Sequence, residues 1–377
     1  MGAGGRPEGR KGRAESALIY RLCGVRHTSY ASDRAIAVIP ADRRAVGLLV
    51  ALGAAAPWLI PELYVVSYLT PWLIWTGATL GLNLLMGWAG QIHLGYAAIM
   101  AVGAYSSIHL ARAGAPFVLA AAGGGLAAMV AGSIFGMPAL RVRGLYLAMS
   151  TLALQAIVDW VIVHVPAISG GAQATLIAPR LSAFGVDLST ATARYLMALG
   201  FCLLVTLFMI NVRRTDLGRA LLALREKDYA AEVIGVNVYY YKALAFGVSS
   251  FIGGVSGAAL AFWFYRAVTP EQFGLDVSIR AAAMVITGGM GSVIGSYFGA
   301  GFILLAPIFL ERLLRWAAAV AGVGIPVTTL SHLPLVLYGV LIVGFLLVEP
   351  LGLAKLYDNV RNYLLVWPFG YTRKQAA

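Results

Sequence analysis

Long runs of apolar residues, separated by short polar connections, fill most of the chain between residues 46 and 348. About 20 apolar residues are enough to cross the hydrocarbon core of a bilayer as one helix. We therefore predict membrane-spanning helices from these runs, which are residues 46–60, 64–87, 94–110, 116–137, 145–165, 194–212, 243–264, 277–310 and 333–348.

The run at residues 277–310 is too long for one membrane helix. Its 34 residues would form a helix of about 51 Å, which is also short for two complete crossings. The sequence GGMG at residues 288–291 interrupts helical structure inside the run. We predict one short and one full helix joined at these glycines. The chain then has about ten membrane helices and is an all-α polytopic membrane protein.

One polar segment, residues 213–242, interrupts the apolar pattern. Lys, Arg, Asp and Glu make up ten of its thirty residues but only 12% of the whole chain. A segment with this much charge belongs in water, and its many cations favour the cytoplasmic side of the membrane. We predict that it forms a folded cytoplasmic surface on which another protein docks.

Helix signals divide this polar segment into two parts. Asp216 is a candidate N-cap for a first helix at residues 217–225. Asp228 is a candidate cap for a second, shorter helix at residues 229–234, through a hydrogen bond from the Ala231 N–H. Gly235 then ends this helix in the left-handed conformation.

Composition and charge agree with a membrane protein. Of the 377 residues 60% are hydrophobic, more than a soluble domain buries. The formal charge of +12 follows the rule that Lys and Arg gather in cytoplasmic segments, so it does not indicate nucleic acid as a partner. We predict a largely disordered cytoplasmic tail at residues 1–45, a membrane domain at 46–350 surrounded by lipid, and a second cytoplasmic tail at 351–377. Cys23 and Cys202 are not expected to form a disulfide or a metal site.

Two glycine-rich interruptions resemble each other. The run GWAG at residues 87–90, followed by Gly95, recurs loosely as GGMG at residues 288–291, followed by Gly295. Matched broken helices in two halves of a chain indicate an internal pseudo-repeat and a transport path. Close packing of helices through small residues explains the same pattern.

Polar side chains flank the first interruption. Asn83, Gln91 and His93 either line a path with neutral hydrogen-bonding groups suited to a zwitterion, or satisfy backbone groups that a broken helix leaves free. Both interpretations stay open. The candidate solute path comprises Asn83, Gly90, Gln91, His93, Gly95, Gly288, Gly289 and Gly291.

Four motifs, in order, carry a resemblance to a known family. They are GLNLLMGWAGQIHLGYAAIMAVGAY (81–105), LRVRGLYLAMSTLAL (140–154), GRALLALREKDYAAEVIGVNVYYYKALAF (218–246) and ITGGMGSVIGSYFGA (286–300). They resemble the branched-chain amino acid permeases of ABC importers, particularly the M-type subunit. The resemblance covers roughly residues 69–353 and implies the ABC importer permease fold.

The resemblance also implies the partners and the location. Such permeases lie in the bacterial inner membrane, here with both termini in the cytoplasm. They pair with a second, homologous permease, two cytoplasmic ATPase subunits and an extracytoplasmic solute-binding protein. No Gly-x-x-x-x-Gly-Lys-Ser/Thr loop occurs in this chain. We therefore expect no cofactor on the chain and no enzyme activity of its own, because the partner subunits bind the ATP.

By the same resemblance, the second helix of the polar segment is a coupling helix that contacts the ATPases. Ala230, Ala231 and Gly235 fall within it, and the small alanines would let a partner approach closely. Arg225 and Glu226 come just before it, and Asp228 belongs to the same coupling set.

Alternatives stay open for the transported solute and for the class of function. The family transports branched-chain amino acids, and relatives carry urea, amides or small organic acids. An ion-coupled secondary transporter usually keeps mid-span carboxylates, which this chain almost lacks. The GVSG run at residues 254–257 matches an intramembrane serine protease pattern, but Ser256 then needs a base within hydrogen-bond reach.

Overall fold

The computed structural model describes residues 40–139, 144–171, 175–179, 182–183, 186–187, 189–321, 336, 339–340, 343–344, 347 and 352–366. The chain divides into two compact units, Pro57–Lys355 and Met1–Ala56 with Leu356–Ala377. Nearly all of the predicted N-terminal tail, most of the last predicted span and part of the C-terminal tail lie outside the described residues. The account below concerns the unit Pro57–Lys355.

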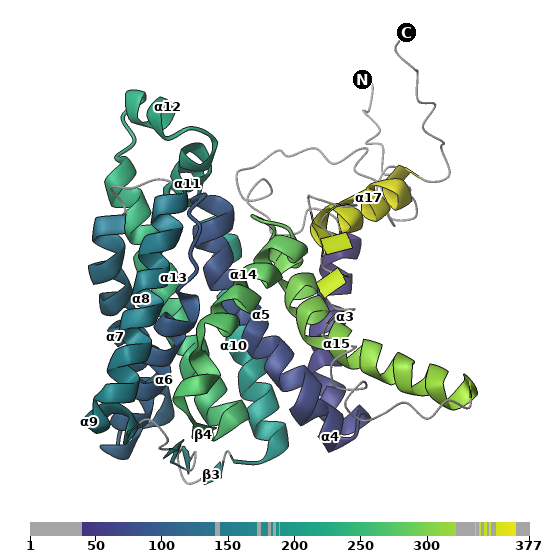
Figure 1. Cartoon of the computed structure of the whole chain (residues 1–377). Coiled ribbons are helices and arrows are strands. Elements are labelled where there is room, and N and C mark those ends of the chain that lie inside the picture. The colour runs from purple at the N-terminus through teal and green to yellow at the C-terminus, as the bar shows by residue number, and fades with distance from the viewer. Residues whose placement is uncertain are drawn as a thin grey trace, which may run out of the picture. The chain divides into compact units, whose positions relative to one another are not determined.

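Helices make up almost all of the described chain, as Figure 1 shows. Helices α3 (Pro40–Leu59) and α17 (Leu353–Val366) cross from one unit to the other. The remaining α-helices are α4 (Glu62–Tyr64), α5 (Thr70–Asn83), α6 (Tyr96–Arg112), α7 (Phe117–Ala139), α8 (Leu145–His164), α9 (Pro166–Ser169), α10 (Ala191–Val212), α11 (Asp216–Glu226), α12 (Asp228–Val233), α13 (Val238–Ala259), α14 (Leu275–Gly288) and α15 (Val293–Ala321). Wider π-helical turns and one 3-10 turn connect them at η1 (Val65–Leu69), η2 (Leu84–Trp88), η3 (Leu260–Tyr265) and η4 (Pro270–Phe273).

Two small antiparallel sheets lie at one end of the helical bundle. Strand β1 (Leu176–Ile177) pairs with β4 (Ala267–Val268), and β2 (Ser182–Ala183) pairs with β3 (Val186–Asp187). Helices α11 and α12 lie at the opposite end (Figure 1). The bundle therefore has two different ends, with short sheets at one and two short helices at the other.

Five helices in the described part of the chain are long and apolar enough to cross a membrane. They are Phe117–Ile134, Tyr146–His164, Ala191–Val212, Val238–Tyr265 and Val293–Trp316. The predicted span at residues 64–87 is one continuous helical rod assembled from α4, η1, α5 and η2, and the predicted span at 94–110 is the shorter helix α6. The prediction of an all-α polytopic membrane protein is confirmed.

The long apolar run at residues 277–310 divides as predicted. Helix α14 ends at Gly288 and α15 begins at Val293, so a short and a long helix meet at the glycines. Gly289 and Gly291 have φ angles of 110° and 88°. A side chain is strained at such angles, which explains why glycine occupies both positions.

Glycines also bring α6, α7 and α13 into close contact. A Cβ atom on Gly103 would overlap the Gly254 backbone, and one on Gly257 would overlap the Met100 carbonyl oxygen. Helix backbones in an apolar bundle associate through such small residues because lipid provides no hydrophobic drive between them. The GVSG run at residues 254–257 therefore belongs to a helix contact.

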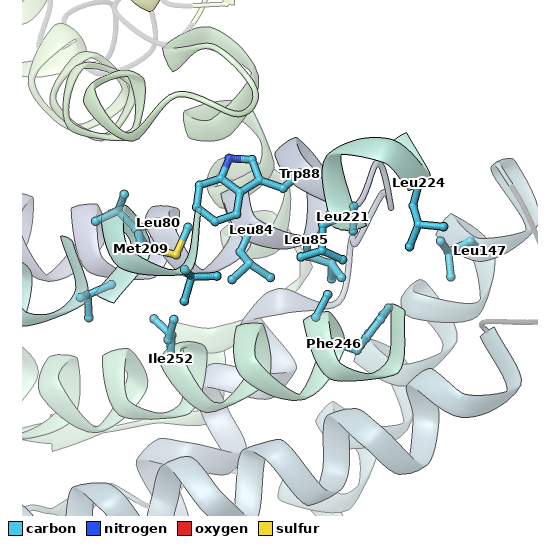
Figure 2. Close-up of a cluster of buried hydrophobic side chains, with 14 of the residues drawn as sticks. Leu80, Leu84, Leu85, Trp88, Leu147, Met209, Leu221, Leu224, Phe246 and Ile252 are labelled. Carbon is cyan, nitrogen blue, oxygen red and sulfur yellow. The ribbon is translucent and has the colours of Figure 1, made fainter. Parts of the chain in front are cut away.

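A cluster of buried apolar side chains joins the polar end to the bundle (Figure 2). Leu221 and Leu224 of α11 are 0% and 2% exposed. They pack with Leu85 and Trp88 of η2 and with Phe246 of α13. Helix α11 is therefore fixed to the membrane helices along its inner face.

We predict that Gly257→Ala destabilises the protein by about 1–3 kcal/mol, because the new methyl group needs the α6 and α13 backbones to separate. Gly200→Ala is the matched control, since nothing lies within 4 Å of a Cβ at that helical position. The midpoint of thermal unfolding of the purified protein measures both variants. Equal midpoints for the two alanine variants would contradict the close contact.

Candidate functional site

The two broken helices meet inside the bundle. The first break, residues 89–95, separates η2 from α6, and the second break, residues 289–292, separates α14 from α15. A Cβ on Gly87 would overlap the Gly291 backbone nitrogen, so the two chains touch there. The Trp88 indole N–H donates to the Gly291 carbonyl oxygen at 3.0 Å. The two interruptions that resemble each other in sequence are therefore neighbours in space.

Asn83 holds the second break in place. Its Nδ2 donates to the Ser292 carbonyl oxygen at 2.8 Å and to Ser296 Oγ at 3.0 Å. Its Oδ1 accepts the Gly291 N–H at 2.7 Å. A carboxamide has two donors and one oxygen acceptor, and all of these groups are engaged here. Asn83 thus satisfies backbone groups that the broken helix leaves free, and the prediction that it lines a solute path stays a prediction.

His93 and Gly95 are packed into the first break. His93 Nδ1 accepts the Gly95 N–H at 3.1 Å, and its ring lies 5.2 Å from the ring of Phe246 between centroids. A Cβ on Gly95 would overlap the Thr151 carbonyl oxygen. These two residues shape the turn into α6.

Gln91, like His93 with its Nε2, has a buried side-chain atom without a hydrogen-bond partner among the described residues. Its backbone N–H donates to the Leu85 carbonyl oxygen at 3.1 Å, which anchors the loop. Its side chain is 4% exposed, and its Oε1 has no hydrogen-bond partner among the described residues. A buried acceptor without a donor is uncommon in folded proteins.

The polar segment folds as two helices, as predicted, but the N-cap residues of these helices are not the predicted ones. Thr215, not Asp216, is the N-cap of α11, and Asp216 is the first helical residue and pairs with Arg219. Asp228 likewise starts α12, and the Ala231 N–H bonds to the Lys227 carbonyl oxygen. Both cap predictions were wrong.

Asp228 does not cap α12 because its carboxylate pairs with a residue that is distant in the sequence. Its Oδ2 accepts from Lys242 Nζ at 2.6 Å, and the Lys242 side chain is 9% exposed. A charge pair of this burial is a stronger interaction than a hydrogen bond to a neutral N–H. Gly235 follows the C-terminus of α12 with φ 90°, which confirms the left-handed residue predicted there.

Helix α12 presents large apolar side chains outward. Tyr229, Val233 and Ile234 are 75%, 68% and 75% exposed. Ala231 is 2% exposed and packs into the cluster of Figure 2, while Ala230 is exposed. The expectation that both alanines face a partner is therefore wrong for Ala231, which attaches α12 to its own protein.

Arg225 connects α11 to the first break. Its Nη1 donates to the Gly87 carbonyl oxygen at 2.7 Å. A Cβ on Gly90 would lie 3.4 Å from Arg225 Cγ, and Gly90 has φ 65°, so glycine leaves room for the side chain. The last turn of α11 is thus bonded to Gly87, the residue that touches Gly291.

A cavity of about 380 Å³ lies beside this connection. Its walls come from the first break, the start of α8, the junction of α11 and α12, and α13. They comprise Ala89, Gly90, Gln91, Gly144, Leu147, Leu224, Arg225, Glu226, Lys227, Asp228, Tyr229 and Lys242.

Sequence reasoning missed Trp88, Ser292 and Lys242. An indole N–H inside an apolar run is a signal, because a buried Trp usually finds an acceptor. Lys242 appeared to be one more cytoplasmic charge, and its partner lies 14 residues away on another helix. No signal in the single sequence pairs Asn83 with a glycine 208 positions later.

Ser256 has no arrangement for nucleophilic catalysis. Its Oγ donates to the Ile252 carbonyl oxygen of the same helix at 2.8 Å, and it is 0% exposed. No histidine bonds to it within the described ranges, and no cluster of three or more His, Cys, Asp or Glu residues there suits a metal ion.

We predict that Asn83→Leu destabilises the protein, because the buried Gly291 N–H loses its partner at a cost of about 1–3 kcal/mol, while the Ser292 carbonyl oxygen keeps its bonds from Ser296. Ser256→Ala is the control, since it removes a buried hydroxyl that bonds only to Ile252 of its own helix. Thermal unfolding of the purified proteins compares them. A control variant that unfolds as early as Asn83→Leu would refute the bridging role.

Comparisons with known proteins agree with this architecture. Residues 64–348 match the family described as "Branched-chain amino acid transport system / permease component". The chain is 34% identical over 273 residues to the high-affinity branched-chain amino acid transport system permease protein LivM of Escherichia coli, covering 66% of this chain and 63% of that protein. It is 32% identical over 269 residues to the LivM protein of Salmonella typhimurium, covering 65% of this chain and 63% of the relative.

A third relative is archaeal. The probable branched-chain amino acid transport permease protein LivM of Methanocaldococcus jannaschii is 24% identical over 224 residues, which cover 59% of this chain and 64% of that protein. The chain thus spans less than two thirds of the length of these relatives. No solved structure matches it significantly. The match over residues 64–348 and the apolar helices together place this multi-pass membrane protein in the branched-chain amino acid transport permease family.

Proposed function

We propose that the chain is the permease subunit of an ATP-driven ABC importer for a branched-chain amino acid or a related small organic solute. The observation that carries this proposal is one continuous set of contacts. It begins at the exposed apolar face of α12 and passes to α11 through the backbone bonds of Lys227. It continues from Arg225 to Gly87 and reaches the second break through the Trp88–Gly291 bond. A push on α12 would thereby reach the interrupted helices inside the bundle.

The partners follow from what the chain lacks and what it exposes. It has no nucleotide-binding loop, so two ATPase subunits would supply the energy at the α11–α12 end. The α11–α12 end then faces the cytoplasm, as do both termini, and the permease lies in the inner membrane. A second homologous permease completes the path, and a solute-binding protein delivers the solute at the strand end.

The outward face of α12 fits an ATPase groove. Tyr229, Val233 and Ile234 together form a small apolar surface on a short helix, and Glu226 and Lys227 stand beside it. Helix-in-groove recognition uses such an apolar face with a polar border. Arg225 and the Asp228–Lys242 pair then hold the helix from behind.

We predict that the double variant Val233→Asp, Ile234→Asp lowers copurification of the ATPase subunits at least tenfold, because two carboxylates would be desolvated at an apolar contact. Uptake driven by ATP should fall in parallel. Ile177→Asp is the control, since Ile177 is 66% exposed on β1 at the other end of the bundle. Retained ATPase binding in the double variant would exclude α12 as the docking helix.

Reconstitution separates the importer from an ion-coupled carrier. In proteoliposomes with all partner subunits, uptake should require ATP and should continue when ionophores collapse the proton and sodium gradients. Calorimetry on the partner solute-binding protein would then identify the solute among branched-chain amino acids, urea, amides and small organic acids. Uptake that stops with the ionophores and persists without ATP would overturn the proposal.

A further inference from the structure

Arg312 of α15 is held against two tyrosine rings at the surface of the bundle. Its guanidinium carbon lies 5.7 Å from the ring centroid of Tyr64 and 5.5 Å from that of Tyr68. Its Nη2 also donates to the Tyr68 hydroxyl oxygen at 3.0 Å. A cation at this distance over a tyrosine ring is attracted to the ring face. The three contacts fix the position of a guanidinium that is still exposed.

The exposed face of α15 around Arg312 is apolar. Phe309 and Trp316 lie three residues before and four residues after Arg312, so they share its side of the helix. Their side chains are 68% and 66% exposed. The segment Val293–Trp316 is long and apolar enough to cross a membrane. In a bilayer this face of the helix contacts lipid, with Trp316 at the end of the span, where interfacial aromatic residues are common.

The position of Arg312 along its helix corresponds to the headgroup layer. The helix from Val293 to Arg312 is about 28 Å long, close to the thickness of about 30 Å of the hydrocarbon core. Tyr64 stands at the start of the rod whose other end, at Trp88, packs with α11. Figure 1 shows α4, which contains Tyr64, at the end of the bundle opposite α11 and α12. The cluster therefore belongs to the strand end.

The protein supplies no anion to Arg312. In the part of the chain that the structure describes, Arg315 pairs with Glu311, whereas Arg312 pairs with no carboxylate. A guanidinium has five N–H donors, and one of them is used by Tyr68. The planar fork of the remaining donors matches two oxygens of a phosphate group. Phospholipid phosphates are the anions that a bilayer places at this level, beside an apolar helix face.

We propose that Arg312, with Tyr64 and Tyr68, binds the phosphate group of a phospholipid at the strand end of the permease. The N–H groups that Tyr68 does not use donate to the phosphate oxygens, and the acyl chains extend past Phe309 toward the membrane centre. With the α11–α12 end in the cytoplasm, the site lies in the outer leaflet, on the side where the topology rule leaves few cations. The inference rests on the proposed function only for this choice of leaflet.

The direct test is titration of dioleoyl phosphatidylglycerol into the purified full chain in an uncharged detergent, followed by thermal unfolding. The midpoint should rise with lipid concentration and then saturate. Dioleoylglycerol has the same acyl chains without the phosphate, and inorganic phosphate lacks the chains. Neither should raise the midpoint at the same molar concentration, because the site uses both the phosphate and the adjoining apolar face.

Arg312→Gln should weaken the apparent lipid affinity about fivefold or more, the loss expected for one cation beside the headgroups. Arg312→Lys should restore part of it, because it keeps the charge and loses the planar fork. The double variant Glu311→Gln, Arg315→Gln is the matched control. It removes a paired charge of each sign from the same helix, leaves the net charge unchanged, and should bind lipid as the unaltered chain does.

Photocrosslinking locates the lipid without any variant. Phosphatidylglycerol with a photoreactive headgroup should label residues 62–68 and 309–316 of the unaltered chain. Labelling only at other segments would overturn the site, as would unchanged lipid affinity in Arg312→Gln or an equal rise in midpoint with inorganic phosphate alone.

A protein contact is the remaining alternative for this face of the bundle. Arg312→Gln that keeps its lipid affinity and loses binding of the partner solute-binding protein would show such a contact and exclude the lipid site. ATP-driven uptake by the complete complex is measured separately. If uptake fails while lipid binding at Arg312 is found, the importer proposal and the choice of leaflet fail and the lipid site stands.

Discussion

Two helices of this permease stop inside the apolar bundle, where water does not satisfy the backbone groups that they leave free. Unpaired N–H and C=O groups at such depth cost several kcal/mol, so each break needs partners from the protein. The helix before the first break supplies partners to the second. Asn83 and Trp88, from the helix before the first break, bond to Gly291 in the second. Polar side chains from one half of the chain thereby stabilise the backbone of the other.

The same region also connects the polar end to the membrane interior. Arg225 adds a bond from α11 to Gly87, which touches Gly291. Leu221 and Leu224 fix the same helix along its inner face. A displacement of α11 would therefore break several hydrogen bonds or move both breaks with it. Hydrogen bonds in a water-free interior are strong, so breaking them is the less favourable of these two outcomes.

Sequence patterns predicted the elements better than their partners. The glycines at 288–291 divided α14 from α15 because a local backbone requirement is visible in the residues themselves. Asp228 was misread as a cap because its partner, Lys242, is brought close only when α13 docks. Ala231 turned inward because a helix of six residues is too short for periodicity to mark its buried face. Asn83 was recognised as a candidate, but its contact with Gly291 depends on tertiary structure.

The junction of α11 and α12 determines how a push would be transmitted. Lys227 is extended there, with φ −156°, and its N–H bonds to the Ala223 carbonyl oxygen in α11 while its own carbonyl oxygen accepts the Ala231 N–H in α12. Helix α12 is attached in addition through Ala231 and the Asp228–Lys242 pair. The pair is short and mostly buried, and a charge displaced from its partner in such surroundings is costly. A load on α12 would therefore pass directly to the membrane helix α13 through Lys242 as well as to α11.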